Sequence, residues 1–120
     1  MSPPAAASTS PSEPRPARIE VLYFDGCPNH AAVLARLREL LARRDEQPVI
    51  ELVRVDSDDD ARAHRFLGSP TVRIDGADIE PDAAERTDYG LKCRLYRTAA
   101  GLAGMPDEAE LAAALDRTRP

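Results

Sequence analysis

Hydrophobic positions in the first half of the chain follow two spacings, which predict a strand, a helix and a second strand. Residues 19–24 are rich in β-branched and aromatic side chains, which favours a mostly buried strand. Residues 28–44 carry apolar side chains at helical spacing, and arginines close the segment at its negative pole. Residues 49–55 mix Val, Ile and Leu, which indicates a strand buried on both faces. Together these segments predict a βαβ unit with parallel strands.

An acidic run opens the second half of the chain. Aspartates at 56 and 58–60 suit the positive end of a helix, with Asp56 or Ser57 as its cap. The run lacks the alternating ligand spacing of a calcium loop, so it favours a charged first turn over a metal site. The pattern predicts that this helix continues through Leu67 and ends at Gly68.

A hairpin is predicted next. Pro70 precedes a third strand at 71–74, and Asp75-Gly76 is a strong turn signal that returns residues 77–80 antiparallel to it. The remaining segments are predicted as a polar loop at 81–91, an alternating strand at 92–98, a turn at 99–105 and a helix that opens at 106–108.

Composition narrows the class of protein. A chain of 120 residues with 42% hydrophobic and 31% charged residues fits one globular domain. The net charge of -5 disfavours nucleic acid and anionic membranes as partners, and no apolar run is long enough to span a membrane. Residues 1–17 are rich in Pro, Ala and Ser and lack the apolar core of a secretory signal. We therefore expect a disordered tail, a folded domain at 18–120 and a cytoplasmic location with reducible thiols.

Cys27 is the strongest candidate for chemistry. It follows a strand and an Asp-Gly break, and Pro28 suits the first position of a helix. This pattern places Cys27 at the N-cap, where free N–H groups and the helix dipole favour the thiolate. The sequence thus predicts a reactive cysteine, and the alternative is a buried, inert one.

Two further residues bear on Cys27. His30 lies in the first turn of the same helix, where an imidazolium would favour the thiolate and a neutral ring would pass protons; a solvated ring without a role is the alternative. Cys93 is the second thiol of the chain, and it would resolve a mixed disulfide if the 81–91 loop returns it to Cys27. If residues 92–98 instead pair with the third strand, Cys93 lies at the far edge and is structural. A third hypothesis is a soft-metal site for zinc, copper or mercury built from Cys27, His30 and Cys93.

The order of elements, with Cys-Pro after the first strand and Ser-Pro-Thr before the third, resembles the thioredoxin fold. The stretches Tyr-Phe-Asp-Gly-Cys-Pro-Asn, Gly-Ser-Pro-Thr and Tyr-Gly-Leu-Lys-Cys-Arg-Leu-Tyr-Arg-Thr resemble a family of small bacterial thioredoxin-like proteins, some with selenocysteine at the position of Cys27. The resemblance implies an α/β fold whose central mixed sheet of four to five strands is flanked by helices. It also implies redox chemistry without a cofactor, on a small thiol or a protein disulfide.

The resemblance carries roles to individual residues. It implies that Pro70 is cis and lies against the active cysteine, and it places the substrate beside these residues: Pro28, Asn29, Ser69, Pro70 and Thr71. The chain departs from the thioredoxin pattern because Cys27-Pro28-Asn29-His30 has no second cysteine.

Three hypotheses follow. The first is a thiol-dependent redox protein, reducing a disulfide or a peroxide, with Cys27 as nucleophile, Cys93 as resolving thiol and His30 as modulator. The second is the soft-metal binder, and the third is an interaction module whose cysteines have lost their chemistry. Arg94 and Arg97 either line a site for an anionic thiol such as glutathione or form an exposed strand face.

Overall fold

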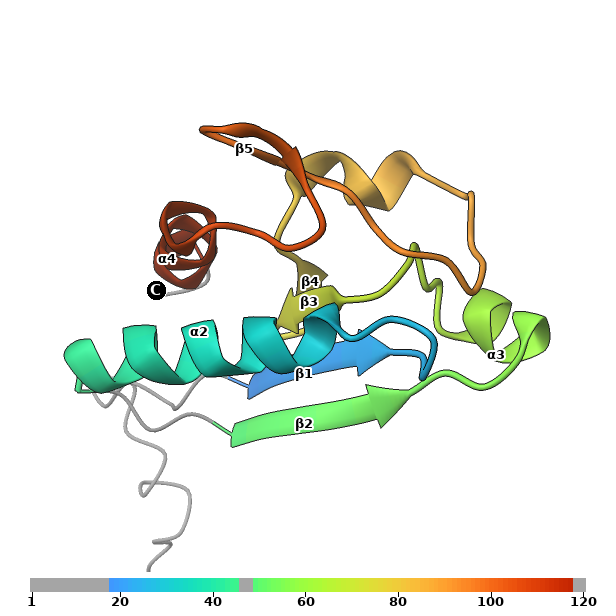
Figure 1. Ribbon diagram of the computed structural model, residues 1–120, viewed down its shortest axis with the longest axis horizontal. Helices are drawn as coiled ribbons and strands as arrows, with labels where there is room; N and C mark the ends of the chain where they lie inside the picture. Colours follow the sequence, from blue (N-terminus) through green and yellow to red (C-terminus); the bar gives the residue numbers. More distant parts are fainter. Residues whose placement is uncertain (1–17, 46–48, 118–120) are drawn as a thin grey trace, which may run out of the picture.

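A mixed sheet of four strands with helices on both faces forms the body of the protein (Figure 1). The computed structural model describes residues 18–45 and 49–117. The predicted tail at 1–17 and most of the predicted connection at 45–48 lie outside the described residues. None of the described helices has the length and apolar character needed to cross a membrane.

The sheet has the strand order β2-β1-β3-β4. Its strands are β1 at Arg18–Tyr23, β2 at Val49–Arg54, β3 at Thr71–Ile74 and β4 at Ala77–Asp78. β1 and β2 are parallel, as the predicted βαβ unit requires, whereas β3 is antiparallel to both β1 and β4. The predicted hairpin is confirmed, because Asp75 and Gly76 both have positive φ angles (52° and 88°), as a tight two-residue turn demands.

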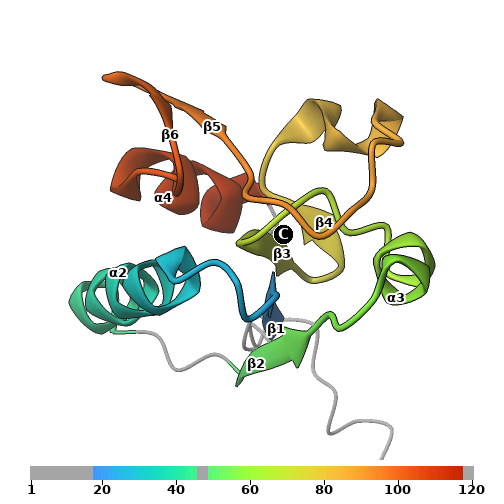
Figure 2. The same ribbon diagram turned by 45° about the vertical axis from the view of Figure 1, so that its right-hand side comes forward.

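Two helices cover one face of the sheet and a short helix covers part of the other (Figure 2). Helices α2 at Asn29–Arg43 and α4 at Glu108–Arg117 pack over β1 and β3. Helix α3 at Asp58–Ala63 lies on the opposite face, where Phe66 and Leu22 form a second, smaller core. The main core comprises Ile19, Val21, Val33, Leu37, Leu40, Leu41, Val72, Ile74, Ile79, Tyr96, Leu111, Ala114 and Leu115.

The prediction that the second strand is buried on both faces is wrong. β2 lies at the edge of the sheet, and Val49 and Leu52 are 59% and 49% exposed. Of the β2 residues, Ile50 and Val53 pack partly against the two cores. A run of apolar residues therefore marked a strand correctly but not its position in the sheet.

Helix α3 is shorter than predicted. Ser57 caps it, since its Oγ accepts a hydrogen bond from the amide of Asp60. The helix ends at Ala63 because Arg65 takes a left-handed conformation with φ 54°, and the amide of Phe66 then bonds back to the carbonyl of Ala61. An arginine thus has the role that the sequence assigned to Gly68.

The segment between β4 and α4 also differs from the prediction. Part of the predicted loop is a 3-10 helix, η1, at Pro81–Glu85. Only the end of the predicted strand is regular, as β5 at Tyr96–Thr98, and it pairs with β6 at Gly101–Ala103 where a turn was expected. β5 and β6 form a separate two-stranded sheet, so the segment that carries Cys93 lies outside the main sheet.

Candidate functional site

The turn between β1 and α2 carries Cys27 into the interior. Its amide donates to the carbonyl of Phe24 (3.2 Å), and the side chain of Cys27 is fully buried. Helix α2 begins two residues later, and Pro28 is at its N-cap. The predicted N-cap position of Cys27 is therefore wrong by one residue, and the hydrogen-bond partners of its sulfur are a carbonyl and a thiol instead of helix N–H groups.

Backbone hydrogen bonds bring the second cysteine to the first. The amide of Ser69 donates to the carbonyl of Lys92 (2.8 Å), and the amide of Arg94 donates to the carbonyl of Ser69 (3.0 Å). Cys93 thus forms a parallel bridge with Ser69, just before β3. Gly68 makes this approach possible: a Cβ there would lie 2.9 Å from the Cβ of Arg94, and its φ of 128° suits only glycine.

The two sulfur atoms are in contact. Sγ of Cys93 donates to Sγ of Cys27 at 3.3 Å, and Sγ of Cys27 donates to the carbonyl of Ser69 at 3.4 Å. Both cysteines are free thiols. The hydrogen bond to Cys27, together with partial burial, raises the pKa of Cys93 above its ordinary value. The predicted proximity of the two cysteines is confirmed, and a disulfide between them needs only a short further approach of the sulfurs.

His30 supports the backbone of Cys27 and not its sulfur. Its Nδ1 lies 3.1 Å from the carbonyl oxygen of Cys27, and since a carbonyl only accepts, a hydrogen bond between them requires the proton on Nδ1. The imidazole also stacks on Tyr23 with ring centroids 4.1 Å apart. These two contacts of the His30 ring do not include the Cys27 sulfur, so they do not support a direct effect on the thiolate. Through its contact with the Cys27 carbonyl, His30 is a positioning residue for the backbone of Cys27.

The other residues implied by the resemblance divide into two groups. Ser69, Pro70 and Thr71 are buried, and the Ser69–Pro70 peptide is cis, as the resemblance implies. The Thr71 hydroxyl donates to the carbonyl of Gly68 (2.6 Å). By contrast, Pro28 is exposed and Asn29 is partly exposed, with its amide donating to the carbonyl of Gly104 (3.3 Å).

A buried arginine is the part of the site that the sequence prediction missed. Arg94 is 1% exposed, and its guanidinium pairs with both carboxylate oxygens of Asp78 (2.7 and 2.8 Å) and with Glu80 (3.0 Å). It also donates to the Thr71 hydroxyl (3.3 Å) and lies 4.5 Å from the ring centre of Tyr96. Burial opposes the charge, but these carboxylates raise the pKa of Arg94 above its ordinary value.

The same segment holds the backbone on the other side of the proline. The Tyr96 hydroxyl donates to the carbonyl of Pro70, and burial raises the pKa of Tyr96 well above its usual range. Arg94 and Tyr96 therefore fasten the Cys93 segment to β3. The sequence carried a partial signal: Arg94 and Tyr96 are two residues apart in the alternating run at 92–98, so an extended chain there places both on one face.

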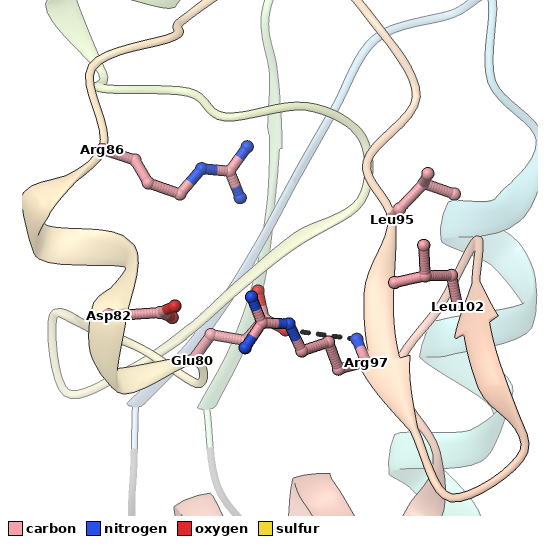
Figure 3. A pocket seen from close by; sticks show the side chains of 6 residues that line it. All are labelled: Glu80, Asp82, Arg86, Leu95, Arg97 and Leu102. Carbon is pink, nitrogen blue, oxygen red and sulfur yellow. Dashed lines mark hydrogen bonds between the residues drawn. The ribbon is translucent and has the colours of Figure 1, made fainter.

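Arg97 differs from Arg94, because it lies on the exposed side of its strand. It lines a hollow of about 230 Å³ with Leu95, Leu102, Glu80, Asp82 and Arg86 (Figure 3). Leu95 and Leu102 are 58% and 68% exposed. Of the two arginines that the sequence offered for an anionic substrate, only Arg97 therefore faces solvent.

The soft-metal hypothesis requires three ligands at one place. Among residues 18–45 and 49–117, no group of three or more His, Cys, Asp or Glu side chains gathers in a way that could hold a metal ion. The ring nitrogen Nδ1 of His30 is engaged by a carbonyl. The triad of Cys27, His30 and Cys93 is thus not assembled as a metal centre.

Comparison with family models, with curated proteins and with solved structures found no match to this chain.

Proposed function

We propose that this protein carries out thiol–disulfide exchange with a disulfide substrate through the pair Cys27 and Cys93. The observation that carries the proposal is the 3.3 Å contact between their sulfurs, made by two residues 66 positions apart in the sequence. Contacts with the backbone next to Pro70 hold both cysteines, so the pair is positioned independently of substrate. A preformed dithiol is what two-thiol exchange requires.

The chemistry balances within the pair and its substrate. A thiolate of the pair attacks one sulfur of a substrate disulfide R–S–S–R′, forms a mixed disulfide and releases R′–S⁻. The second thiol loses its proton and attacks the protein sulfur of the mixed disulfide, which releases R–S⁻ and closes the Cys27–Cys93 disulfide. The protein gives up two electrons and two protons, and the substrate becomes two thiols; a low-molecular-weight thiol in excess reverses the process.

We further propose that the α/β arrangement is thioredoxin-like. What supports this is the βαβ unit β1-α2-β2, the antiparallel hairpin β3-β4 and the position of Cys27 after β1 beside the proline that precedes β3. The fold does not set the function, which rests on the thiol pair. The cytoplasmic location expected from the sequence stays a prediction.

A redox titration tests the function. The reduced protein is equilibrated in graded glutathione buffers, free thiols are trapped with acid and an alkylating reagent, and the cysteines are mapped by peptide mass spectrometry. We expect a Cys27–Cys93 disulfide that forms at one defined potential, and no such species in Cys93→Ser. Glutathione adducts without the internal disulfide, or no response at either cysteine, would contradict a two-thiol mechanism.

A further inference from the structure

The two thiols differ in their access to solvent. Cys27 is completely buried, whereas Cys93 is exposed. Burial alternates along the chain around Cys93, with residues 93, 95 and 97 outside and residues 94 and 96 inside. A disulfide substrate that arrives from solvent therefore meets Cys93 before it can meet Cys27.

Attack on a disulfide requires the three sulfurs to lie nearly in line, so the attacking thiol needs free space on its outer side. Sγ of Cys27 has no such space, because Cys93 and the carbonyl of Ser69 lie against it at 3.3 and 3.4 Å. A resolving thiol has a different requirement, since it must reach only the protein sulfur of the mixed disulfide. Cys27 meets that requirement without any exposure.

We infer that Cys93 is the thiol that attacks the substrate and that Cys27 resolves the mixed disulfide. This order rests on the proposed function and reverses the one expected from the sequence, in which Cys27 attacks first. The first step joins the Cys93 sulfur to one substrate sulfur and expels the other as a thiolate. The second step joins the Cys27 sulfur to Cys93, expels the remaining substrate thiolate and leaves the oxidised pair.

The buried position of Cys27 then protects the resolving step. The mixed disulfide on Cys93 lies in contact with an internal thiol, whereas competing external thiols must approach from solvent. The substrate itself stays outside the core, so the exposed thiol accepts bulky disulfides, including those of polypeptides, without opening the fold. Cys27 as the attacking thiol would require a separation of the Cys93 segment from Ser69 before each reaction.

The test uses dithiodipyridine, a small chromogenic disulfide, and a matched pair of variants, Cys27→Ser and Cys93→Ser. Cys27→Ser retains the exposed Cys93, and we expect it to release one thiopyridone per protein in a fast phase. Cys93→Ser retains the buried thiol, and we expect it to react at least about tenfold more slowly, because an opening that costs even about 1.4 kcal/mol gives that factor. The opposite ranking of the two variants would overturn the inference.

A measurement on the unaltered protein guards against misfolded variants. Wild-type protein is treated with a limiting amount of iodoacetamide under native conditions, and the alkylated peptides are mapped. We expect the label on Cys93, and a label mainly on Cys27 would refute the order. Mass spectrometry of wild-type protein after dithiodipyridine tests the proposed function separately from the order in which the thiols react. Two persistent adducts in place of an internal disulfide would refute the proposed function, whichever thiol reacts first.

Discussion

Replacement of Arg94 by methionine tests the cluster that holds the Cys93 segment in place. The substitution keeps a long apolar side chain but removes the charge that Asp78 and Glu80 share. The side chains of these two acids are only 14% and 12% exposed, so Arg94→Met leaves two neighbouring carboxylates with little access to water. Removal of one partner from a buried ion pair costs about 3–5 kcal/mol, because the remaining charge is uncompensated.

This magnitude is large for a small domain. The free energy of unfolding of such domains is about 5–15 kcal/mol, so the variant loses at least about a fifth of it. At about 4 °C per kcal/mol for a domain of this size, we expect the melting temperature to fall by roughly 12–20 °C. The chain has no tryptophan, so urea and thermal unfolding are best followed by far-ultraviolet circular dichroism.

The chain supplies its own control. Arg97 is on the same strand as Tyr96 but faces solvent, and Arg97→Met should change the free energy of unfolding by less than about 0.5 kcal/mol. The triple variant Asp78→Asn, Glu80→Gln, Arg94→Met removes the uncompensated carboxylates and should recover part of the loss. If Arg94→Met is as stable as Arg97→Met, the buried cluster does not hold the fold together and the reasoning fails.

Three further predictions concern the close approach at Gly68, the partly buried acid Glu110 and the thiol pair. Gly68→Ala should lower stability by about 1–3 kcal/mol and weaken internal disulfide formation, because its Cβ would lie 3.1 Å from the backbone of the segment that holds Cys93; Gly90→Ala, with open space around it, should be neutral in both urea unfolding and the redox titration. Burial raises the pKa of Glu110 from 4.5 to about 7, so the folded state binds its proton more tightly than the unfolded state, and this stability is complete below about pH 4.5 and lost as the pH rises through about 7. Glu110→Gln should therefore gain in melting temperature relative to wild type as the pH rises across this window, and a constant difference would contradict the assignment. Cys27→Ala removes the hydrogen bond that raises the pKa of Cys93, so alkylation of Cys93 should shift to lower pH, and an unchanged pH profile would refute that cause.

Local signals predicted those elements whose structure depends on neighbouring residues. The Asp75-Gly76 turn formed as expected because two positive φ angles are a property of the turn itself, and Ser57 capped α3 because a cap needs only the next three residues. The burial of the second strand was predicted wrongly, since apolar composition does not reveal which strand lies at the edge of a sheet. Long-range packing decided that outcome.

The candidate site also combines a feature that a local motif predicts with features that depend on distant residues. A local motif singled out Cys27, whereas the contact of its sulfur with Cys93 joins residues 66 positions apart, and the burial of Arg94 depends on acidic partners elsewhere in the chain. Alternation around residue 96 predicted a strand but not which side would face the core. Arg94 can point inward because its charge is paired with Asp78 and Glu80. Asp78 ends β4 and Glu80 follows it, and the two acids lie 16 and 14 residues before Arg94 in the chain.

Stability and chemistry are coupled at this site because the same contacts serve both. The Cys93 segment is outside the main sheet, and its two backbone bonds to Ser69 and the side chains of Arg94 and Tyr96 fasten it to the residues around Pro70. Any change that loosens these contacts moves the exposed sulfur relative to the buried one, which stays with β1 and α2. Loss of the Arg94 charge pair should therefore affect the internal disulfide under conditions where the fold still survives, whereas destabilisation elsewhere in the core should leave the potential of the thiol pair unchanged until the protein unfolds.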